Sequence, residues 1–347
     1  MNDLSPKERL IRTLNKETTD RRPVICPGGM MNATVVEVQE LSSRFLPAAH
    51  TDADGMKELA GEVQQRTGFE NFGVPYDMTI EPEVLGSEID LGTIACEPKI
   101  VREVFASAAE TTRRDIKTML GDGRVGVLAD AIAKLHALDP DIPVIGSLTG
   151  PVSTAASIID PMPFLKGLRK DAANSHSVMG YVTDFLIAYA DLLIDHGADV
   201  INIADPTATG EILGPKAFGE FAVPYINRIA DAVHGRGVKV ILHICGEMKA
   251  VWKYMPEIRA DAISTDAMVS LKNLKADFPQ IVTMGNLSTY MLESAEPGKI
   301  EKRTEKLLAD GIDILAPACG LSTASPIQNL RAFTDTVRKI GDSGTGK

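Results

Sequence analysis

Two side chains that bind transition metals lie two residues apart near the end of one apolar segment. The segment Val238–Ile244 is rich in β-branched residues, and it leads into His243 and Cys245. Such a composition is typical of a buried strand. Because side chains alternate between the two faces of a strand, positions 243 and 245 point to the same side. A nitrogen donor and a sulfur donor therefore converge at the end of one predicted strand.

A third donor, Cys319, follows a second strand-like run at Ile312–Ala316. One neutral imidazole and two thiolates suit zinc, and three protein ligands leave the fourth position open to a substrate. The pattern predicts an open zinc site that does chemistry. The alternative is that each cysteine is only a small buried apolar side chain, and we assign that role to Cys26 and Cys96.

The elements that must position these ligands are eight short apolar runs, most of them separated by enough chain for a helix. Strands that alternate with helices predict a parallel sheet, and eight of them predict a closed (β/α)8 TIM barrel. The predicted strands are Pro23–Cys26, Phe72–Tyr76, Pro143–Ser147, Asp199–Ile203, Val238–Ile244, Ala262–Thr265, Ile281–Met284 and Ile312–Ala316.

Two additions to the barrel are expected. The run Ser5–Glu8 offers an N-cap serine, a proline at the first helical position and a glutamate at the third, which predicts an N-terminal helical extension. The alternating residues Glu83–Ile94 predict a β-hairpin inserted after the second strand. We expect residues 1–341 to form one catalytic barrel domain and residues 342–347 to be a disordered tail.

In α/β barrels the chemistry lies where strands end and βα loops begin. Each predicted strand delivers a polar residue or a glycine to that end. The alternative is structural: carboxylates at this rim often cap helices, asparagine favours turns, and glycine gives loop flexibility. The candidates for a substrate pocket are Gly29, Asp77, Asp205, Glu211 and Asn286, and Asp266 is a further carboxylate at the end of the sixth strand.

The bulk composition limits the class of protein. The 347 residues are 44% hydrophobic and 24% charged, as in a globular chain, and the net charge of -11 argues against nucleic-acid binding. We see no uninterrupted apolar run of about 18 residues that would cross a membrane, and no signal peptide. Four cysteines do not make a disulfide framework, and reduced thiols predict a cytoplasmic protein.

The metal-ligand segments resemble a known family. Leu242–Gly246 and Ala316–Gly320 resemble the zinc site of the methylcobamide:coenzyme M methyltransferases, which belong to the uroporphyrinogen decarboxylase superfamily of (β/α)8 barrels. The resemblance extends from Ser5 to about Ile340. Further similar segments are Pro23–Asn32, Gly146–Pro151, Ala204–Ala208, Met284–Leu287 and Ser325–Asn329.

The resemblance implies that a methyl group passes from a methylated corrinoid to a thiol such as coenzyme M. Zinc would favour the thiolate form of that thiol, and two cysteine ligands would keep the bound sulfur electron-rich. The chain has no Asp-x-His-x-x-Gly segment of the kind that binds cobalamin. The corrinoid is therefore expected on a partner protein.

The chain departs from both branches of the superfamily. The decarboxylase carries an arginine-rich segment after strand one, whereas Gly28–Ala33 contains no arginine, although Asp77 matches an aspartate of the decarboxylase. The methyltransferases tend to carry a Ser-x-Glu pattern after strand six, where this chain has Ser264-Thr265-Asp266. The resemblance thus implies Asp266 as a possible labile fourth zinc ligand, but its shorter side chain leaves that position open, and the rim candidates named above would line a substrate or corrinoid pocket.

Several alternatives stay open at this point. The chain could be a decarboxylase-like lyase, a corrinoid methyltransferase with another acceptor such as tetrahydrofolate, or a scaffold that binds the corrinoid protein without fast catalysis. The sequence names neither the acceptor nor the upstream methyl donor, and a homo-oligomer is neither predicted nor excluded.

Overall fold

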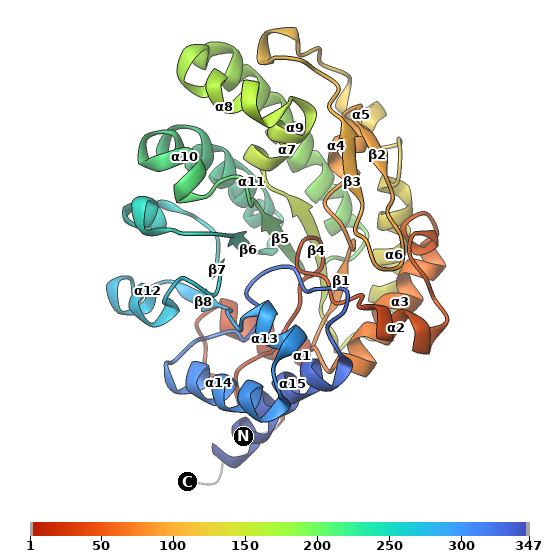
Figure 1. Cartoon of the computed structure of the whole chain (residues 1–347), viewed down its shortest axis with the longest axis vertical. Helices are drawn as coiled ribbons and strands as arrows, with labels where there is room; N and C mark the ends of the chain where they lie inside the picture. Colours follow the sequence, from red (N-terminus) through yellow and green to blue (C-terminus); the bar gives the residue numbers. More distant parts are fainter. Residues whose placement is uncertain (1–2, 345–347) are drawn as a thin grey trace.

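The centre of the fold is a sheet of parallel strands surrounded by helices (Figure 1). The computed structural model describes residues 3–344 of the chain. Six strands pair in the order β1-β4-β5-β6-β7-β8, so that each strand neighbours the next parallel strand along the chain. Their bounds are β1 (Phe72–Val74), β4 (Val144–Thr149), β5 (Val200–Ala204), β6 (Lys239–Ile244), β7 (Ala262–Thr265) and β8 (Val282–Met284).

The sheet closes into a barrel through the two remaining predicted strands. Val24 forms a parallel bridge with Leu315, and Ile314 forms one with Met284. The backbone N–H of Glu70, just before β1, donates to the carbonyl of Val24 at 2.9 Å. The predicted barrel is confirmed, but these two segments make single bridges rather than full strands. Prolines flank them at positions 23, 27 and 317, and proline has no N–H for a strand ladder.

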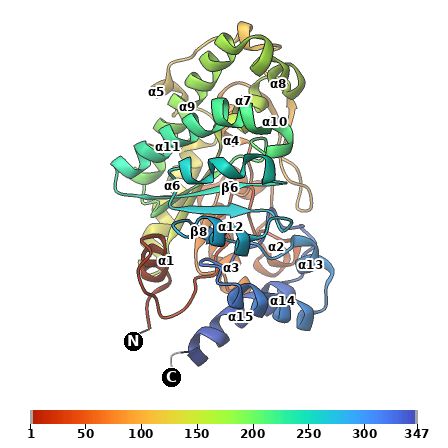
Figure 2. The same cartoon turned by 90° about the vertical axis from the view of Figure 1, so that its left-hand side faces the viewer.

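Helices surround the strands, and α8, α10 and α13 lie on the opposite side of the molecule from α1 (Figure 2). The α-helices are α1 (Pro6–Leu14), α2 (Val36–Ser42), α3 (Ala53–Thr67), α4 (Ile80–Val84), α5 (Ile116–Met119), α6 (Val125–Leu138), α7 (Pro151–Ile158), α8 (Pro161–Lys170), α9 (Ala172–Asp195), α10 (Gly210–Ala217), α11 (Val223–Gly235), α12 (Leu271–Asp277), α13 (Thr289–Ser294), α14 (Pro297–Ala309) and α15 (Ile327–Gly344). Segments of 3-10 helix span Ala48–His50, Ala108–Glu110 and Lys249–Glu257, and a π-helical turn spans Phe218–Ala222.

Helix α1 is the predicted N-terminal extension, and it closes the amino end of the barrel. The hydroxyl of Ser5 accepts the N–H of Glu8 at 3.2 Å, so the predicted cap is present. Leu10 and Leu14 are buried in one cluster with residues from inside the barrel, among them Ile241. The barrel therefore opens toward the carboxyl ends of its strands.

The predicted hairpin exists, but its bounds differ from the expected Glu83–Ile94. Strand β2 (Glu88–Asp90) pairs antiparallel with β3 (Lys99–Arg102), so the return strand begins later than predicted. The loop between them is fixed to other parts of the barrel: Gln39 donates to the carbonyl of Ile94 at 3.0 Å, and Thr323 donates to that of Ala95 at 3.1 Å. These contacts hold the loop at the rim of the barrel.

Helix α9 is long and apolar enough to cross a membrane by length and composition alone. However, 56% of its most apolar window is buried within the protein, and it packs against α7, α8 and α11 as a barrel helix does. At the carboxyl end of the chain, α15 continues to Gly344 and so covers the first three residues of the expected tail. Residues 345–347 lie outside the described part of the chain.

Candidate metal centre

The three predicted ligands converge at the carboxyl end of the barrel. Their donor atoms, one nitrogen and two sulfurs, all lie within 4.8 Å of one another. His243 Nε2 is 3.0 Å from Cys245 Sγ, which is 3.2 Å from Cys319 Sγ. Strand β6 supplies the histidine and the residue after the strand supplies the first cysteine, as the two-residue spacing predicted. The loop after the closing segment supplies Cys319.

The imidazole of His243 is oriented by a hydrogen bond between its Nδ1, the ring nitrogen that does not face the thiols, and a serine on the neighbouring strand. His243 is fully buried and pairs in register with Ser264 of β7. Its Nδ1 lies 2.9 Å from the hydroxyl of Ser264. An Nδ1–H that donates to this hydroxyl leaves the Nε2 lone pair facing the two thiols. A hydrogen bond of this kind behind a ligand histidine fixes both its tautomer and its orientation.

The two thiols lie within hydrogen-bonding distance of each other, and this contact shifts their pKa values in opposite directions. The hydrogen bond from Cys245, followed by contact with His243, lowers the pKa of Cys319. The same hydrogen bond and partial burial raise the pKa of Cys245 above its usual range. Cys319 is therefore the thiol of the pair that loses its proton more easily.

The donor set fits a zinc ion. Zinc is bound tetrahedrally by thiolates at about 2.3 Å and imidazoles at about 2.0 Å, which separates two sulfur ligands by about 3.8 Å. The observed distances of 3.0 and 3.2 Å lie somewhat below the edges of such a tetrahedron, so small outward shifts of the side chains admit the ion. Three protein donors at the mouth of a barrel leave the fourth position for another ligand.

Asp266 lies near this cluster but is not a member of the ligand group found among the described residues. Its carboxylate accepts the N–H of Met268 at 3.4 Å, and its negative charge contributes to the raised pKa of Cys245. Asn286 holds the same loop, because its side-chain amide donates to the carbonyls of Asp266 at 2.7 Å and Val269 at 2.8 Å. Asn286 thus positions the loop after β7.

Asp77 is held in a buried ion pair with Arg124. Arg124 Nη1 lies 2.9 Å from one carboxylate oxygen, and His50 Nδ1 lies 3.0 Å from the same oxygen. The N–H and hydroxyl of Thr79 donate to the other oxygen. Burial alone would raise the pKa of Asp77, but the hydrogen bond from His50 and the charge of Arg124 hold it well below its usual range. These contacts hold the carboxylate of Asp77 in one position, as expected of a structural residue.

Asp205 caps the helix that follows β4. Its carboxylate accepts the N–H groups of Val152 and Ser153 at 3.1 and 2.8 Å, together with the hydroxyl of Ser153 at 2.7 Å. Burial raises the pKa of Asp205 to about 6. The aspartate also fills the space beside Gly150, where an added Cβ would lie 2.4 Å from its own Cβ. These contacts are those of a helix cap, which is the structural alternative for Asp205.

The two remaining pocket candidates border the cluster. Gly29 has a positive φ of 59°, and a Cβ there would lie 2.8 Å from Cβ of Ser147. Glu211 is exposed in the first turn of α10, and its Oε2 lies 3.5 Å from the position of a Cβ at Gly246, the residue after Cys245. Glu211 is thus a carboxylate at the rim beside the metal ligands.

Sequence reasoning missed three residues that the fold brings to the site, namely Ser264, Met30 and Glu97. The thioether Sδ of Met30 lies 3.7 Å from Cys245 Sγ. Glu97 comes from the hairpin loop, accepts from the amide of Asn32 at 3.3 Å, and has a pKa raised first by burial. Its partners are distant in sequence, so no local pattern indicated it.

Comparison with known proteins places this geometry in a family. The family model for uroporphyrinogen decarboxylase (URO-D) matches residues 5–340. Methylcobamide:CoM methyltransferase MtbA of Methanosarcina acetivorans is 32% identical over 97% of this chain and 99% of that protein, and MtbA of Methanosarcina mazei is 33% identical over the same shares. A uroporphyrinogen decarboxylase of Myxococcus xanthus is 26% identical over 82% of each chain.

The fold agrees with these sequence matches. A solved methyltransferase structure from Methanosarcina mazei superposes with a TM-score of 0.90, at 27% identity over 97% of this chain and 99% of that one. The chain therefore belongs to the uroporphyrinogen decarboxylase family, on the branch of the methylcobamide:CoM methyltransferases.

Proposed function

We propose that this protein is a zinc-dependent methyltransferase that moves a methyl group from a methylated corrinoid to a thiol, with coenzyme M as the acceptor. The observation that carries the proposal is the convergence of His243, Cys245 and Cys319 within 4.8 Å at the open end of the barrel. The relatives named methylcobamide:CoM methyltransferases support the choice of donor and acceptor.

The side chains of the chain hold the metal and orient the acceptor. His243 and the two cysteines would be the ligands, and Ser264 would keep the imidazole Nε2 aimed at the ion. When bound, zinc would favour the deprotonated form of the substrate thiol. Two thiolate ligands cancel the charge of the ion, so the substrate sulfur stays electron-rich enough to attack a carbon atom.

The methyl transfer balances as a displacement. The thiol proton leaves to solvent, and the sulfur lone pair attacks the methyl carbon in line with the carbon–cobalt bond. The sulfur–carbon bond forms as the carbon–cobalt bond breaks, and the electron pair of the broken bond stays on cobalt. The corrinoid cobalt is thus reduced from Co(III) to Co(I) while the thiol becomes a thioether.

The corrinoid would arrive on a partner protein at the face of the barrel where the strands end (Figure 2). Large apolar side chains are exposed on helices and loops that follow the strands, as at Met162 of α8, Ile212 of α10, Met268 and Tyr290 of α13. Exposed apolar side chains gathered at one face are typical of a protein-binding surface. The location we propose is the cytoplasm, because the ligand thiols must stay reduced.

A decarboxylase reaction has less support from the contacts of Asp77. Both carboxylate oxygens of this residue are engaged by Arg124, His50 and Thr79, so a substrate would have to displace these partners. An assay with uroporphyrinogen separates the two activities, and we expect no turnover.

The test is a metal analysis followed by a two-substrate assay with free methylcobalamin and coenzyme M. We expect one zinc per chain, and formation of Co(I) that can be followed by its absorbance. Cys319→Ala should abolish both zinc binding and methyl transfer. Cys96→Ala should change neither, because Cys96 is exposed, and the prediction from the sequence that it is buried is wrong. Full activity in a metal-free preparation would contradict the proposal.

A further inference from the structure

A fourth soft donor lies against the cluster of three ligands. The thioether Sδ of Met30 is 3.7 Å from Cys245 Sγ. Two sulfur ligands of one tetrahedral zinc ion, each at about 2.3 Å, are separated by about 3.8 Å. The observed separation of 3.7 Å is therefore close to one edge of such a coordination tetrahedron. Neither Asp266 nor Glu211, the carboxylates near the cluster, is part of the ligand group found among the described residues.

The backbone around Met30 is a tight turn that fixes the position of its Cα. Gly28 and Met31 exchange both N–H to carbonyl hydrogen bonds at 3.0 Å, so Gly29 and Met30 form the tip. The thiol of Cys26 donates to the carbonyl of Met31 at 2.8 Å. A methionine on a mobile loop would lose much conformational freedom on binding a metal, whereas this turn has already removed part of that cost.

The turn also abuts the loop that carries the second cysteine ligand. A Cβ at Gly320, the residue after Cys319, would lie 2.8 Å from the carbonyl oxygen of Met30. The backbone at Met30 therefore touches the Cys319 loop while its sulfur touches Cys245. Two independent contacts place this residue between the two thiol ligands.

We propose that the thioether of Met30 is the fourth ligand of the metal at rest and that the substrate thiolate displaces it. Thioether sulfur is a soft ligand of the kind that suits thiolate-rich sites. It is neutral, so it leaves without a proton, while the incoming thiol gives its proton to solvent and lowers the charge of the site by one. The inference rests on the proposed zinc-dependent function and names the resting ligand of that site.

The exchange would give the site a simple selectivity. A neutral thioether yields to an anionic thiolate, whereas water or a neutral alcohol must compete with a sulfur atom that is already in place. The Asp266 carboxylate, which accepts the N–H of Met268, would instead act through its charge at a distance. This arrangement explains how the chain can dispense with the longer glutamate.

Selenium labelling gives a direct test. Zinc-loaded protein with all 13 methionines replaced by selenomethionine is measured by X-ray absorption at the zinc edge, which detects only selenium bound to zinc. We expect one selenium neighbour at rest and its replacement by sulfur when coenzyme M is added. Met30→Leu should show no selenium neighbour, while Met31→Leu, the matched change at the other turn methionine, should keep it.

Thiol affinity gives a second readout that a merely structural residue would not produce. Met30→Leu should lower the dissociation constant of coenzyme M, about tenfold if Met30 holds the position nine-tenths of the time, because no ligand must leave. A rise in that constant contradicts the proposal. Zinc bound by nitrogen and two sulfurs with no selenium neighbour overturns the Met30 assignment and leaves the methyltransferase function standing. A chain that binds no zinc overturns both.

Discussion

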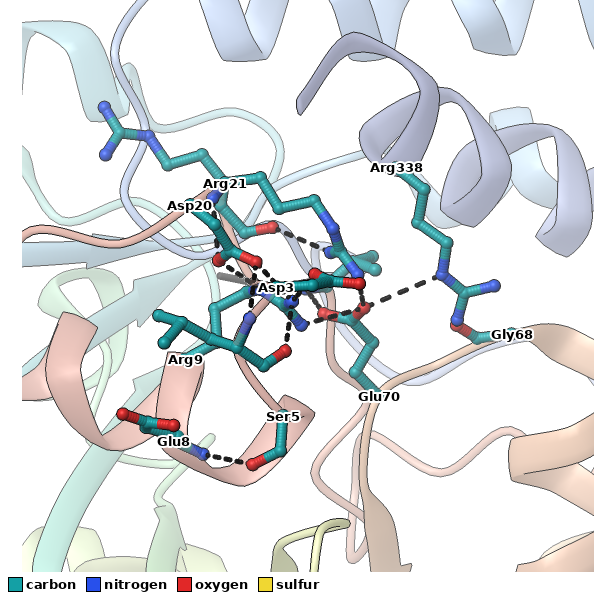
Figure 3. Close-up of polar contacts among 12 residues, drawn as sticks. Asp3, Ser5, Glu8, Arg9, Asp20, Arg21, Gly68, Glu70 and Arg338 are labelled. Carbon is teal, nitrogen blue, oxygen red and sulfur yellow. Dashed lines mark hydrogen bonds and ion pairs between the residues drawn. The ribbon is translucent and has the colours of Figure 1, made fainter. Parts of the chain in front are cut away.

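The two ends of the barrel each carry a cluster of ionisable side chains, and the clusters are built in opposite ways. At the amino end, every charge has an oppositely charged partner: Arg9 pairs with Asp20 at 2.7 Å, and Glu70 pairs with Arg9, Arg21 and Arg338 (Figure 3). At the carboxyl end, the imidazole of His243 and the thiols of Cys245 and Cys319 face one another, and the group contains no carboxylate or other oppositely charged partner among the described residues.

The difference separates structural polar groups from functional ones. In the amino-end network, burial alone would raise the pKa of Asp20, but the hydrogen bond from Arg9 holds it well below its usual range. Buried charges of this sort are stable because their partners are already present. The thiol cluster instead directs three metal-binding donor atoms at one point, which is the arrangement of a ligand site. Barrels generally separate stability and chemistry between these two faces.

The largest effect that the comparison predicts is at the carboxyl end. Cys245→Ser should reduce methyl transfer by about 10³-fold or more, equivalent to about 4 kcal/mol of transition-state stabilisation. The free energy of unfolding of the metal-free chain should stay within about 1 kcal/mol, because the serine keeps the size of the side chain. Steady-state rates and urea unfolding measure the two quantities. A loss of folding equal to the loss of rate would break the distinction between the faces.

The next effect is at the amino end, where a substitution should change the free energy of unfolding but not the rate of methyl transfer. Glu70→Gln removes the buried charge that three arginines share, which should cost about 3–5 kcal/mol of unfolding free energy. The rate per folded molecule should not change. Glu62→Gln is the matched control, because its ion pair with Arg66 is solvent-accessible and should contribute less than about 0.5 kcal/mol. Unfolding curves in urea measure both variants.

The third effect is a pH dependence of the free energy of unfolding. It should come from the buried side chain of Glu81, which lies at the carboxyl end of the barrel. Glu81 accepts the N–H of Thr149 at 2.6 Å, and burial raises its pKa to about 7 from an ordinary value near 4.5. As the pH rises from about 4.5 to 7, the unfolded chain loses this proton while the folded chain retains it. The contribution to stability should therefore fall by about 3 kcal/mol across that window and then level off.

Glu81→Gln should remove this part of the pH dependence. The glutamine keeps an oxygen for the N–H of Thr149 and has no charge to bury. The measurement is the midpoint of thermal unfolding of the metal-free protein between pH 4.5 and 7.5. A variant that keeps the wild-type slope would assign the pH dependence to another group.

The smallest of the four effects concerns the serine behind the ligand histidine. Ser264→Ala should weaken zinc binding by about 10–100-fold, because the imidazole loses the hydrogen bond that orients it. Thr265→Val is the control on the same strand, since the threonine hydroxyl is buried with no hydrogen-bond partner among the described residues. Competition with a chromophoric chelator measures both affinities. Equal affinities in the two variants would remove Ser264 from the site.

The sequence predicted the parts of the site that depend on local periodicity. The spacing of His243 and Cys245 follows from the repeat of a strand, and the position of Cys319 follows from the end of another predicted strand. The residues that sequence reasoning missed depend on distance in the fold. Ser264 reaches His243 through strand pairing, and Met30 reaches Cys245 across 215 residues.

Distance along the chain also explains why the contacts of Asp77 and Asp205 could not be predicted from the sequence. Asp77 and Asp205 come at the ends of predicted strands, which made them candidates for a pocket. Their partners, Arg124 and Ser153, lie 47 and 52 residues away, and nothing near the aspartates in sequence indicates such contacts. The two bridging segments were predicted as strands from apolar composition, whereas the flanking prolines limit them to single bridges.

The seam between Val24 and Leu315 has a consequence for how the protein is made. The ring closes only when a segment near the start of the chain meets one near its end, and the third ligand, Cys319, lies just beyond that seam. During synthesis His243 and Cys245 leave the ribosome well before Cys319 does. A chain truncated between residues 245 and 319 thus offers zinc only two of the three proposed ligands, and the complete ligand set is formed only in the closed barrel.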